Sequence, residues 1–222
     1  MKYIFFLALG FPLISACTDT PSARKRTAEC YVRYLASEGQ FRAEVTLREA
    51  RGPQAELEAI EAPEGVRYNG TLMPAVYGKG VRYQLEQPAG YHNRHTFSWK
   101  YGEQAFSFPV DLPAITSFSF GPGRLSRQRP DTLRWNGAPL EQGESIVLLW
   151  ESTGGSLTVP MEISGIPGQK TIEFPAAKLA ALAPGTWTLY LVRKKRVKAE
   201  QNGAILYGLA EYFTASDTLK VE

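Results

Sequence analysis

Apolar and polar side chains alternate along much of the chain from residue 28 onward, and this pattern predicts β-strands. Residues 41–48 alternate strictly, and residues 30–35 are rich in amino acids that favour strands. A short segment with turn residues, 37–39, lies between these two runs. We therefore predict a β-hairpin at the start of the folded part of the chain.

Turn signals recur through the rest of the first half. Asn69-Gly70 separates the apolar runs 66–68 and 71–73 and is typical of a two-residue hairpin turn with positive φ at both positions. Residues 51–63 fit either a helical turn or an edge strand. Further strands are expected at 81–85, 95–101 and 105–110. Together these elements predict a β-sandwich over residues 28–112.

The second half, residues 113–222, shows the same kind of pattern. We expect Asn136-Gly137 to form another turn. A helix is predicted near 175–182, because Pro175 suits a first helical turn and Gly185 follows its end. Strands are expected at 115–120, 132–135, 145–151 and 171–174.

The last hairpin carries most of the clustered charge. Asn202-Gly203 again predicts a two-residue turn, and pairing of Gln201 with Ala204 fixes the register by counting. The register then places Lys194 opposite Glu211, Arg193 opposite Tyr212 and Lys198 opposite Tyr207. Such pairs contribute about 0.2–1 kcal/mol each. We expect this hairpin to project beyond the sandwich and to offer five cations to a partner: Arg193, Lys194, Lys195, Arg196 and Lys198.

The first sixteen residues have the order of a secretory signal peptide. Lys2 precedes an apolar run over 3–14, and the small residues Ser15 and Ala16 follow it. The run is shorter than the roughly 20 residues that span a bilayer as a helix. Residues 1–16 are therefore expected to direct export and to be removed.

The residues Ile14-Ser15-Ala16-Cys17 resemble the lipobox of bacterial lipoproteins. The resemblance implies cleavage before Cys17 and attachment of acyl chains such as palmitate there, and two or more chains hold a protein on a membrane stably. It implies a lipid-anchored protein of the cell envelope, at the outer membrane and facing the periplasm. The alternative is that Cys17 is simply a small residue after a conventional cleavage site.

Residues 17–27 are expected to form a short lipidated tether. They are polar and contain the basic residues 24–26, which either rest on anionic headgroups or belong to a solvated linker. Lipoproteins displayed on the cell surface often carry an acidic cluster after the cysteine, but here only Asp19 is present. The sequence therefore does not favour surface display.

The segment that leads into the expected strand at 186–191 resembles a second family. Leu182-x-Pro-Gly-Thr-Trp187-x-Leu189 is similar to the start of the sixth strand in fibronectin type III and related Ig-like sandwiches, where a tyrosine closes a corner. Here Trp187 takes that place, and its indole N–H can still donate. The fold expected from pattern and resemblance is all-β, with two tandem Ig-like or fibronectin-like sandwiches after the signal peptide and tether.

Composition narrows the function only slightly. Hydrophobic residues make up 44% of the chain, which is enough to bury a core. The 25 Lys and Arg residues barely exceed the 22 Asp and Glu, so the charge makes no case for nucleic acid. If Cys17 is acylated, Cys30 is left alone. It is then a small buried side chain on a strand or, as the alternative, a reactive thiol or one that forms an intermolecular disulfide.

The sequence carries no recognisable catalytic motif. The two histidines, His92 and His95, lie in a polar stretch that we interpret as a surface loop, with their use as metal ligands as the alternative. We found no nucleophile elbow, phosphate loop or paired-cysteine zinc spacing. We therefore expect no enzyme activity, no cofactor and no metal.

Two functional hypotheses of different class remain. The first is a non-catalytic envelope module that binds or scaffolds a protein partner. The second is glycan binding, with exposed tyrosines as stacking platforms: Tyr91, Tyr101, Tyr207 and Tyr212. The four tryptophans are expected in the core instead: Trp99, Trp135, Trp150 and Trp187.

Overall fold

The computed structural model describes residues 25–52, 54–121 and 124–222. The expected signal peptide, Cys17 and the tether up to residue 24 lie outside the described residues. Strands dominate the described part, whose single helix is α1 (Ala176–Leu179), so the prediction of an all-β fold is confirmed. None of the described helical structure has the length and apolar composition of a membrane span.

The first half begins with the expected hairpin, formed by β1 (Lys25–Leu35) and β2 (Gln40–Ala50). β1 starts earlier than expected, so residues 25–27 belong to a strand and not to the tether. Thr27 is buried and Arg26 forms an ion pair with Glu49, which explains this extension. The other strands are β3 (Glu58–Ala59), β4 (Val66–Tyr68), β5 (Thr71–Met73), β6 (Ala75–Tyr77), β7 (Val81–Pro88), β8 (Arg94–Tyr101) and β9 (Gln104–Asp111).

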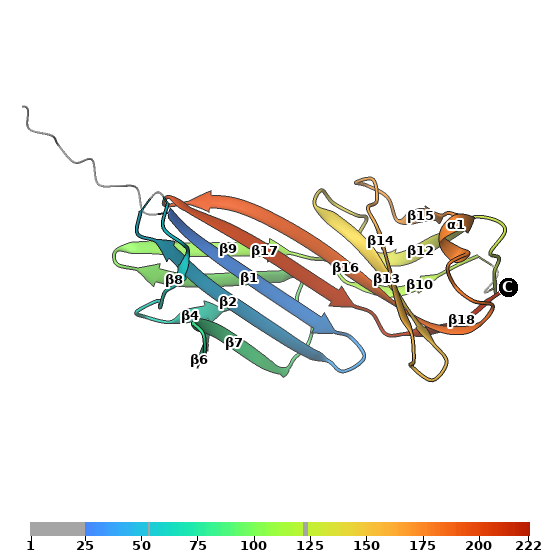
Figure 1. The fold of residues 1–222 in the computed structure, drawn as a ribbon, viewed down its shortest axis with the longest axis horizontal. Coiled ribbons are helices and arrows are strands. Elements are labelled where there is room, and N and C mark those ends of the chain that lie inside the picture. Colours follow the sequence, from blue (N-terminus) through green and yellow to red (C-terminus); the bar gives the residue numbers. More distant parts are fainter. Residues whose placement is uncertain (1–24, 53, 122–123) are drawn as a thin grey trace, which may run out of the picture.

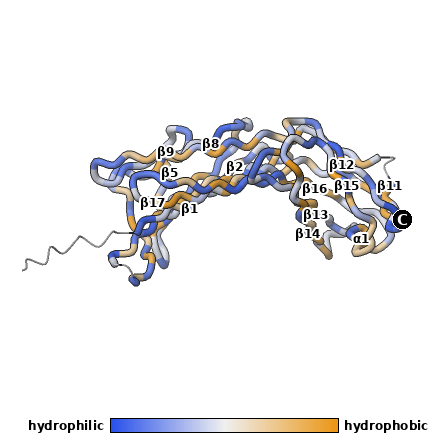
Figure 2. Tube along the Cα trace, turned by 90° about the horizontal axis from the view of Figure 1, so that it is seen from above, coloured by the Kyte–Doolittle hydropathy of each residue, from blue (hydrophilic) through white to orange (hydrophobic). Residues whose placement is uncertain are grey.

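Two layers enclose the core of the first half. One layer is the sheet β5-β4-β8-β9, and the other contains β1-β2-β7-β6. Figure 2 shows β8 and β9 running along one layer and β1 and β17 along the other. Inward-facing side chains alternate along β8, where Phe97 and Trp99 are buried. Residues 51–63 hold the short edge strand β3, which pairs with β2.

The second half also contains two sheets. Its strands are β10 (Ile115–Ser119), β11 (Arg124–Leu125), β12 (Asp131–Gly137), β13 (Glu144–Ser152), β14 (Thr158–Ile163), β15 (Thr171–Phe174), β16 (Gly185–Gln201), β17 (Ala204–Phe213) and β18 (Asp217–Val221). One sheet has the order β10-β12-β15, and the other places β13 between β14 and β16, with β18 on the far side of β16. These two sheets form a β-sandwich. Trp150 on β13 is fully buried.

The corner before β16 is closed as expected. The indole N–H of Trp187 donates to the backbone carbonyl of Ala183 at 2.9 Å. The helix is shorter than the expected 175–182, because only the four residues of α1 are helical.

The prediction of a turn at Asn136-Gly137 is wrong. Both residues lie within β12, and Gly137 pairs with Ile115 on β10. Gly137 has φ +138°, and a Cβ atom there would lie 2.4 Å from the carbonyl oxygen of Ala114. Glycine at this position therefore permits a close approach of two strands and does not form a hairpin turn.

The terminal hairpin has the register that was counted from the sequence. Gln201 pairs with Ala204 across the turn, and Lys194 faces Glu211 at 3.5 Å between Nζ and Oε1. Asn202 at the turn has φ +50°, as the Asn-Gly signal predicts. The pairs of Arg193 with Tyr212 and of Lys198 with Tyr207 are also confirmed.

The hairpin extends beyond the second-half sandwich, as expected, but it is not free, because β17 pairs with β1 of the first half. The parallel pairing of β17 with β1 runs from Arg26 and Ala204 to Leu35 and Phe213. Figure 1 shows β16 and β17 leaving the second half and lying beside β1 along the length of the first half. The apolar side of β17 explains this position, because Ala204, Leu206 and Ala210 are buried against the core.

One sheet therefore runs through both halves. Its order is β11-β18-β16-β17-β1-β2-β7-β6, and β13 joins it through the first part of β16. The hairpin of β16 and β17 belongs to residues 113–222 in the sequence, but it adds its strands to the sheet that contains β1 and β2.

Gly208 marks the place where this hairpin packs under β9. A Cβ atom at Gly208 would lie 2.9 Å from Phe108 Cε1 and from Val110 Cγ2, and both side chains are buried. The absence of a side chain at Gly208 thus lets β17 pack closely against the opposite layer.

We expect Gly208→Val to lower the free energy of unfolding by about 1–3 kcal/mol, because overpacking forces the neighbouring core residues to move. Urea unfolding checks this value. The matched control is Gly78→Val, where a Cβ atom meets nothing within 4 Å, and it should change stability by no more than about 0.5 kcal/mol. Equal effects of the two substitutions would contradict the close packing of β17.

Candidate functional site

The five cations predicted to bind a partner are divided between the two sides of β16. Side chains alternate along a strand, so Arg193 and Lys195 point into the molecule while Lys194, Arg196 and Lys198 point outward. Arg193 is fully buried. The expectation that Arg193 contacts a partner is therefore wrong.

Arg193 instead belongs to a buried cluster of the second half, at the part of β16 that pairs with both β13 and β17. Its Nη2 lies 2.5 Å from Glu144 Oε2 and donates to the carbonyl of Pro139 at 2.7 Å, and its Nη1 donates to the carbonyl of Ala138 at 3.0 Å. Glu144 is also fully buried at its carboxylate. Lys195 Nζ lies 3.6 Å from the other oxygen of Glu144, so it belongs to the same buried cluster. Sequence reasoning missed this cluster because its members come from distant strands.

Removing one member of this pair should be costly. We expect Arg193→Met to lower the free energy of unfolding by about 3–5 kcal/mol, because the buried carboxylate of Glu144 loses its guanidinium partner and only the more distant Lys195 remains near it. The double variant R193M/E144L should recover most of that loss. As a control, Arg94→Met breaks the exposed pair with Asp111 and should cost at most about 1 kcal/mol. Denaturant unfolding of the wild type and the three variants measures these free energies. If the double variant is no more stable than Arg193→Met, the loss does not come from the unpaired charge of Glu144.

The outward cations border a sheet face that we call the outer face. It is the outward side of β16, β17, β1 and β2 and includes Arg196, Lys198, Tyr207, Leu209, Tyr31 and Thr46. The opposite layer packs on the other side of this sheet, so the outer face is open to solvent. A hollow of about 530 Å³ lies on it.

Aromatic, basic and acidic groups are interspersed on the outer face. Tyr207 is 42% exposed, and Lys198 Nζ lies 5.9 Å from the centre of its ring. Arg196 is exposed and pairs with Glu162 of β14 at 3.3 Å. An aromatic ring beside a lysine and an arginine is the kind of grouping that dominates binding energy in protein interfaces.

A second hollow of about 790 Å³ continues the outer face beyond Thr46, which lines both hollows. It forms because β7 pairs with β2 only as far as Tyr83 and Val45, while β3 pairs with β2 at Arg48 and beyond. The space between β3 and the β6–β7 hairpin is left open.

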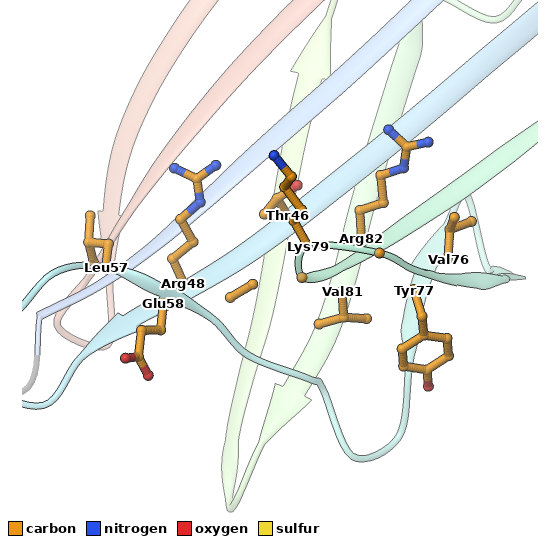
Figure 3. A pocket seen from close by; sticks show the side chains of 12 residues that line it. Thr46, Arg48, Leu57, Glu58, Val76, Tyr77, Lys79, Val81 and Arg82 are labelled. Atoms are coloured by element: carbon orange, nitrogen blue, oxygen red, sulfur yellow. The ribbon is translucent and has the colours of Figure 1, made fainter.

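Three cationic side chains line this second hollow. Figure 3 shows the side chains of Arg48, Lys79 and Arg82 pointing to the same side, while Glu58 points to the opposite side. Arg48 Nη1 lies 3.4 Å from Glu29 Oε1. Within the described ranges, neither Lys79 nor Arg82 takes part in an ion pair. The outer face therefore has cations at both ends, with the rings of Tyr207 and Tyr31, Leu209 and the carboxylates of Glu29 and Glu44 between them.

The histidines do not form the expected pair of surface residues. His92 is exposed, but His95 lies on an inward position of β8 and is only 3% exposed. The hydroxyl of Tyr68 lies 2.7 Å from Nδ1 of His95. Burial lowers the pKa of His95 to about 4. In the parts of the chain that the structure describes, no three His, Cys, Asp or Glu side chains are grouped to hold a metal.

The lowered pKa of His95 predicts a loss of stability in mild acid. In the unfolded chain His95 binds a proton near pH 6.5, whereas in the folded protein it does so only near pH 4. The part of the free energy of unfolding that depends on neutral His95 is complete above the pKa of this histidine in the unfolded chain. It should fall by about 2 kcal/mol between pH 7.5 and pH 5. Urea unfolding at the two pH values should show a smaller difference for His95→Gln but the wild-type difference for His92→Gln. A wild-type pH dependence in His95→Gln would contradict this assignment.

The four tyrosines proposed for glycan stacking do not share one platform. Tyr101 lies under the guanidinium of Arg26 at 4.2 Å, and Tyr207 lies beside Lys198. Tyr91 and Tyr212 pack edge to face at 4.6 Å. Rings that lie beneath cations favour the contact surface of a protein over a row of exposed stacking platforms.

The remaining core predictions are confirmed. All four tryptophans are buried. Cys30 is a buried free thiol on β1, and burial raises its pKa. This position fits the small-hydrophobe interpretation and not an intermolecular disulfide.

Comparison with known proteins finds neither a family model nor a curated protein that matches this sequence. The functional argument therefore depends on the geometry of the outer face and on the sequence signals that precede it.

Proposed function

We propose that this chain is a non-catalytic, lipid-anchored protein of the cell envelope that binds a protein partner through the outer face. The observation that carries the proposal is the open sheet face on which Tyr207, Arg196 and Lys198 are gathered. A sheet face of this kind is a contact surface: aromatic and arginine side chains supply binding energy, and the surrounding charges supply orientation.

The distribution of charge defines the partner. Arg196 and Lys198 border one end of the outer face, and Lys79 and Arg82 border the other. Leu209 and the ring of Tyr207 lie between them, together with the carboxylates of Glu29 and Glu44. A complementary partner presents acidic side chains at both ends of its contact surface and apolar and basic groups between them, and the opposite charges would also speed its association at low ionic strength.

The proposed anchor would keep this face close to the membrane. Lys25, where β1 begins, is eight positions after Cys17. An extended chain spans at most about 3.6 Å per residue, so the start of β1 would stay within roughly 30 Å of acyl chains on Cys17. We place the protein at the outer membrane, facing the periplasm, where membrane proteins and soluble envelope proteins are both within reach.

Site-specific photocrosslinking in intact envelopes tests the proposal. A photoreactive phenylalanine analogue in place of Tyr207 should give one discrete protein adduct, and the same analogue in place of the exposed Leu157 on the second half should not. The charge reversals Lys198→Glu and Arg82→Glu together should reduce the adduct at least about tenfold, because they set like charges against an acidic partner.

Two controls make the result specific. Arg134→Glu reverses an exposed charge on β12, away from the outer face, and should leave the Tyr207 adduct unchanged. Cys17→Ser should remove the acyl adduct from the intact mass and weaken crosslinking to a membrane partner. Equal adducts from positions 207 and 157, or a Tyr207 adduct that survives the double reversal, would overturn the proposal.

A further inference from the structure

A third hollow, distinct from the outer face, lies at the end of the first sandwich where β1 finishes. Its volume is about 190 Å³. We call it the tyrosine pocket. The residues that line it come from β1, β2, β4, β5, β7, β8 and the connections β4–β5 and β7–β8, and they include Tyr34, Phe41, Tyr68, Tyr91, His92 and His95.

The rings of the pocket are held in place by one another. Tyr34 and Tyr91 lie 4.9 Å apart between ring centres, and Phe41 and Tyr68 lie 5.0 Å apart. Tyr68 is fixed further by its contact with Nδ1 of His95, and the hydroxyl of Tyr91 donates to the carbonyl of Leu112. Rings that are ordered before a ligand arrives lower the entropy cost of binding.

No acidic side chain, lysine or arginine lines the pocket. His95 is neutral at pH 7 because burial disfavours its protonated form. A charged ligand would therefore lose hydration without gaining a counter-charge in the pocket, which is unfavourable. The pocket thus selects for a neutral group.

The rim adds neutral hydrogen-bonding groups to the aromatic interior. Asn69, Thr71 and Gln87 are exposed at the opening. The side-chain carbonyl of Asn69 accepts from the backbone N–H of Thr96 at 2.8 Å, which orients this amide and leaves its NH₂ group for a ligand. A ligand that suits both parts has an apolar face for the rings and hydroxyl groups for the rim.

We infer that the tyrosine pocket binds one ring of a neutral saccharide. The C–H groups of a sugar ring carry slight positive charge and suit the negative faces of aromatic rings, while its hydroxyls match the neutral rim. A purely apolar group of similar size would contact the rings but leave the rim unused. This inference does not depend on the outer face, so either proposal can fail without the other.

The two histidines give a direct signal for the test. They are the only histidines in the chain, and both line the pocket. We would record their ring signals by NMR in the full-length, histidine-labelled protein while adding N-acetylglucosamine as a neutral sugar. Glucosamine, glucuronate and indole serve as cationic, anionic and apolar probes of comparable ring size.

N-acetylglucosamine should shift the histidine signals saturably, and glucosamine and glucuronate should not shift them at the same concentrations at constant pH. Gly90→Phe should abolish the shift, because Gly90 lies on the rim and a Cβ atom there meets open space that the new ring can fill. Gly78→Phe, at an equally open position outside the pocket, is the control and should retain the shift.

Three results would overturn the inference. A saturable response to indole without one to N-acetylglucosamine would make the pocket an apolar site. Equal responses to all four probes, or a response that persists in Gly90→Phe, would show binding without selection by this pocket. No response of the wild-type protein to N-acetylglucosamine would exclude the site.

Discussion

The fold depends on one strand that takes part in two sandwiches. The first part of β16 pairs with β13 and β18 in the second half, and its remainder pairs with β17, which in turn extends the sheet of the first half through β1. The buried Arg193–Glu144 pair lies where β16 passes from one sandwich to the other. A strand that is hydrogen-bonded on both sides of this junction resists bending there, so the two halves are held in one orientation.

This shared strand also creates the candidate interface. The outer face needs Tyr207 and Lys198 from the terminal hairpin and Tyr31 from β1, which lie far apart in the sequence but side by side in the sheet. A partner that binds this face would therefore recognise only the completely folded chain. The tyrosine pocket, by contrast, is lined by residues of the first half alone, which supports treating it as a separate site.

Local signals in the sequence predicted much of the fold. Alternation located the strands, and the Asn202-Gly203 turn fixed the register of the last hairpin by counting. The same alternation places Arg193 and His95 on inward positions, but their polar character favoured the surface, so both were misassigned. The parallel pairing of β1 with β17 had no local signal, because it joins strands separated by most of the chain. The outer face and the tyrosine pocket are products of that long-range pairing and of packing between layers, so the sequence showed their residues without showing their grouping.

Native-state hydrogen exchange in increasing urea tests the shared-strand account most directly. The amides that join β1 to β17 and those that join β13 to β16 belong to one continuous sheet. If the shared strand couples the halves, both sets should lose protection together, with the same dependence on urea, through global unfolding. If the β13–β16 amides open at lower urea while the β1–β17 amides stay protected, or the reverse, the two sandwiches unfold independently and the account is contradicted.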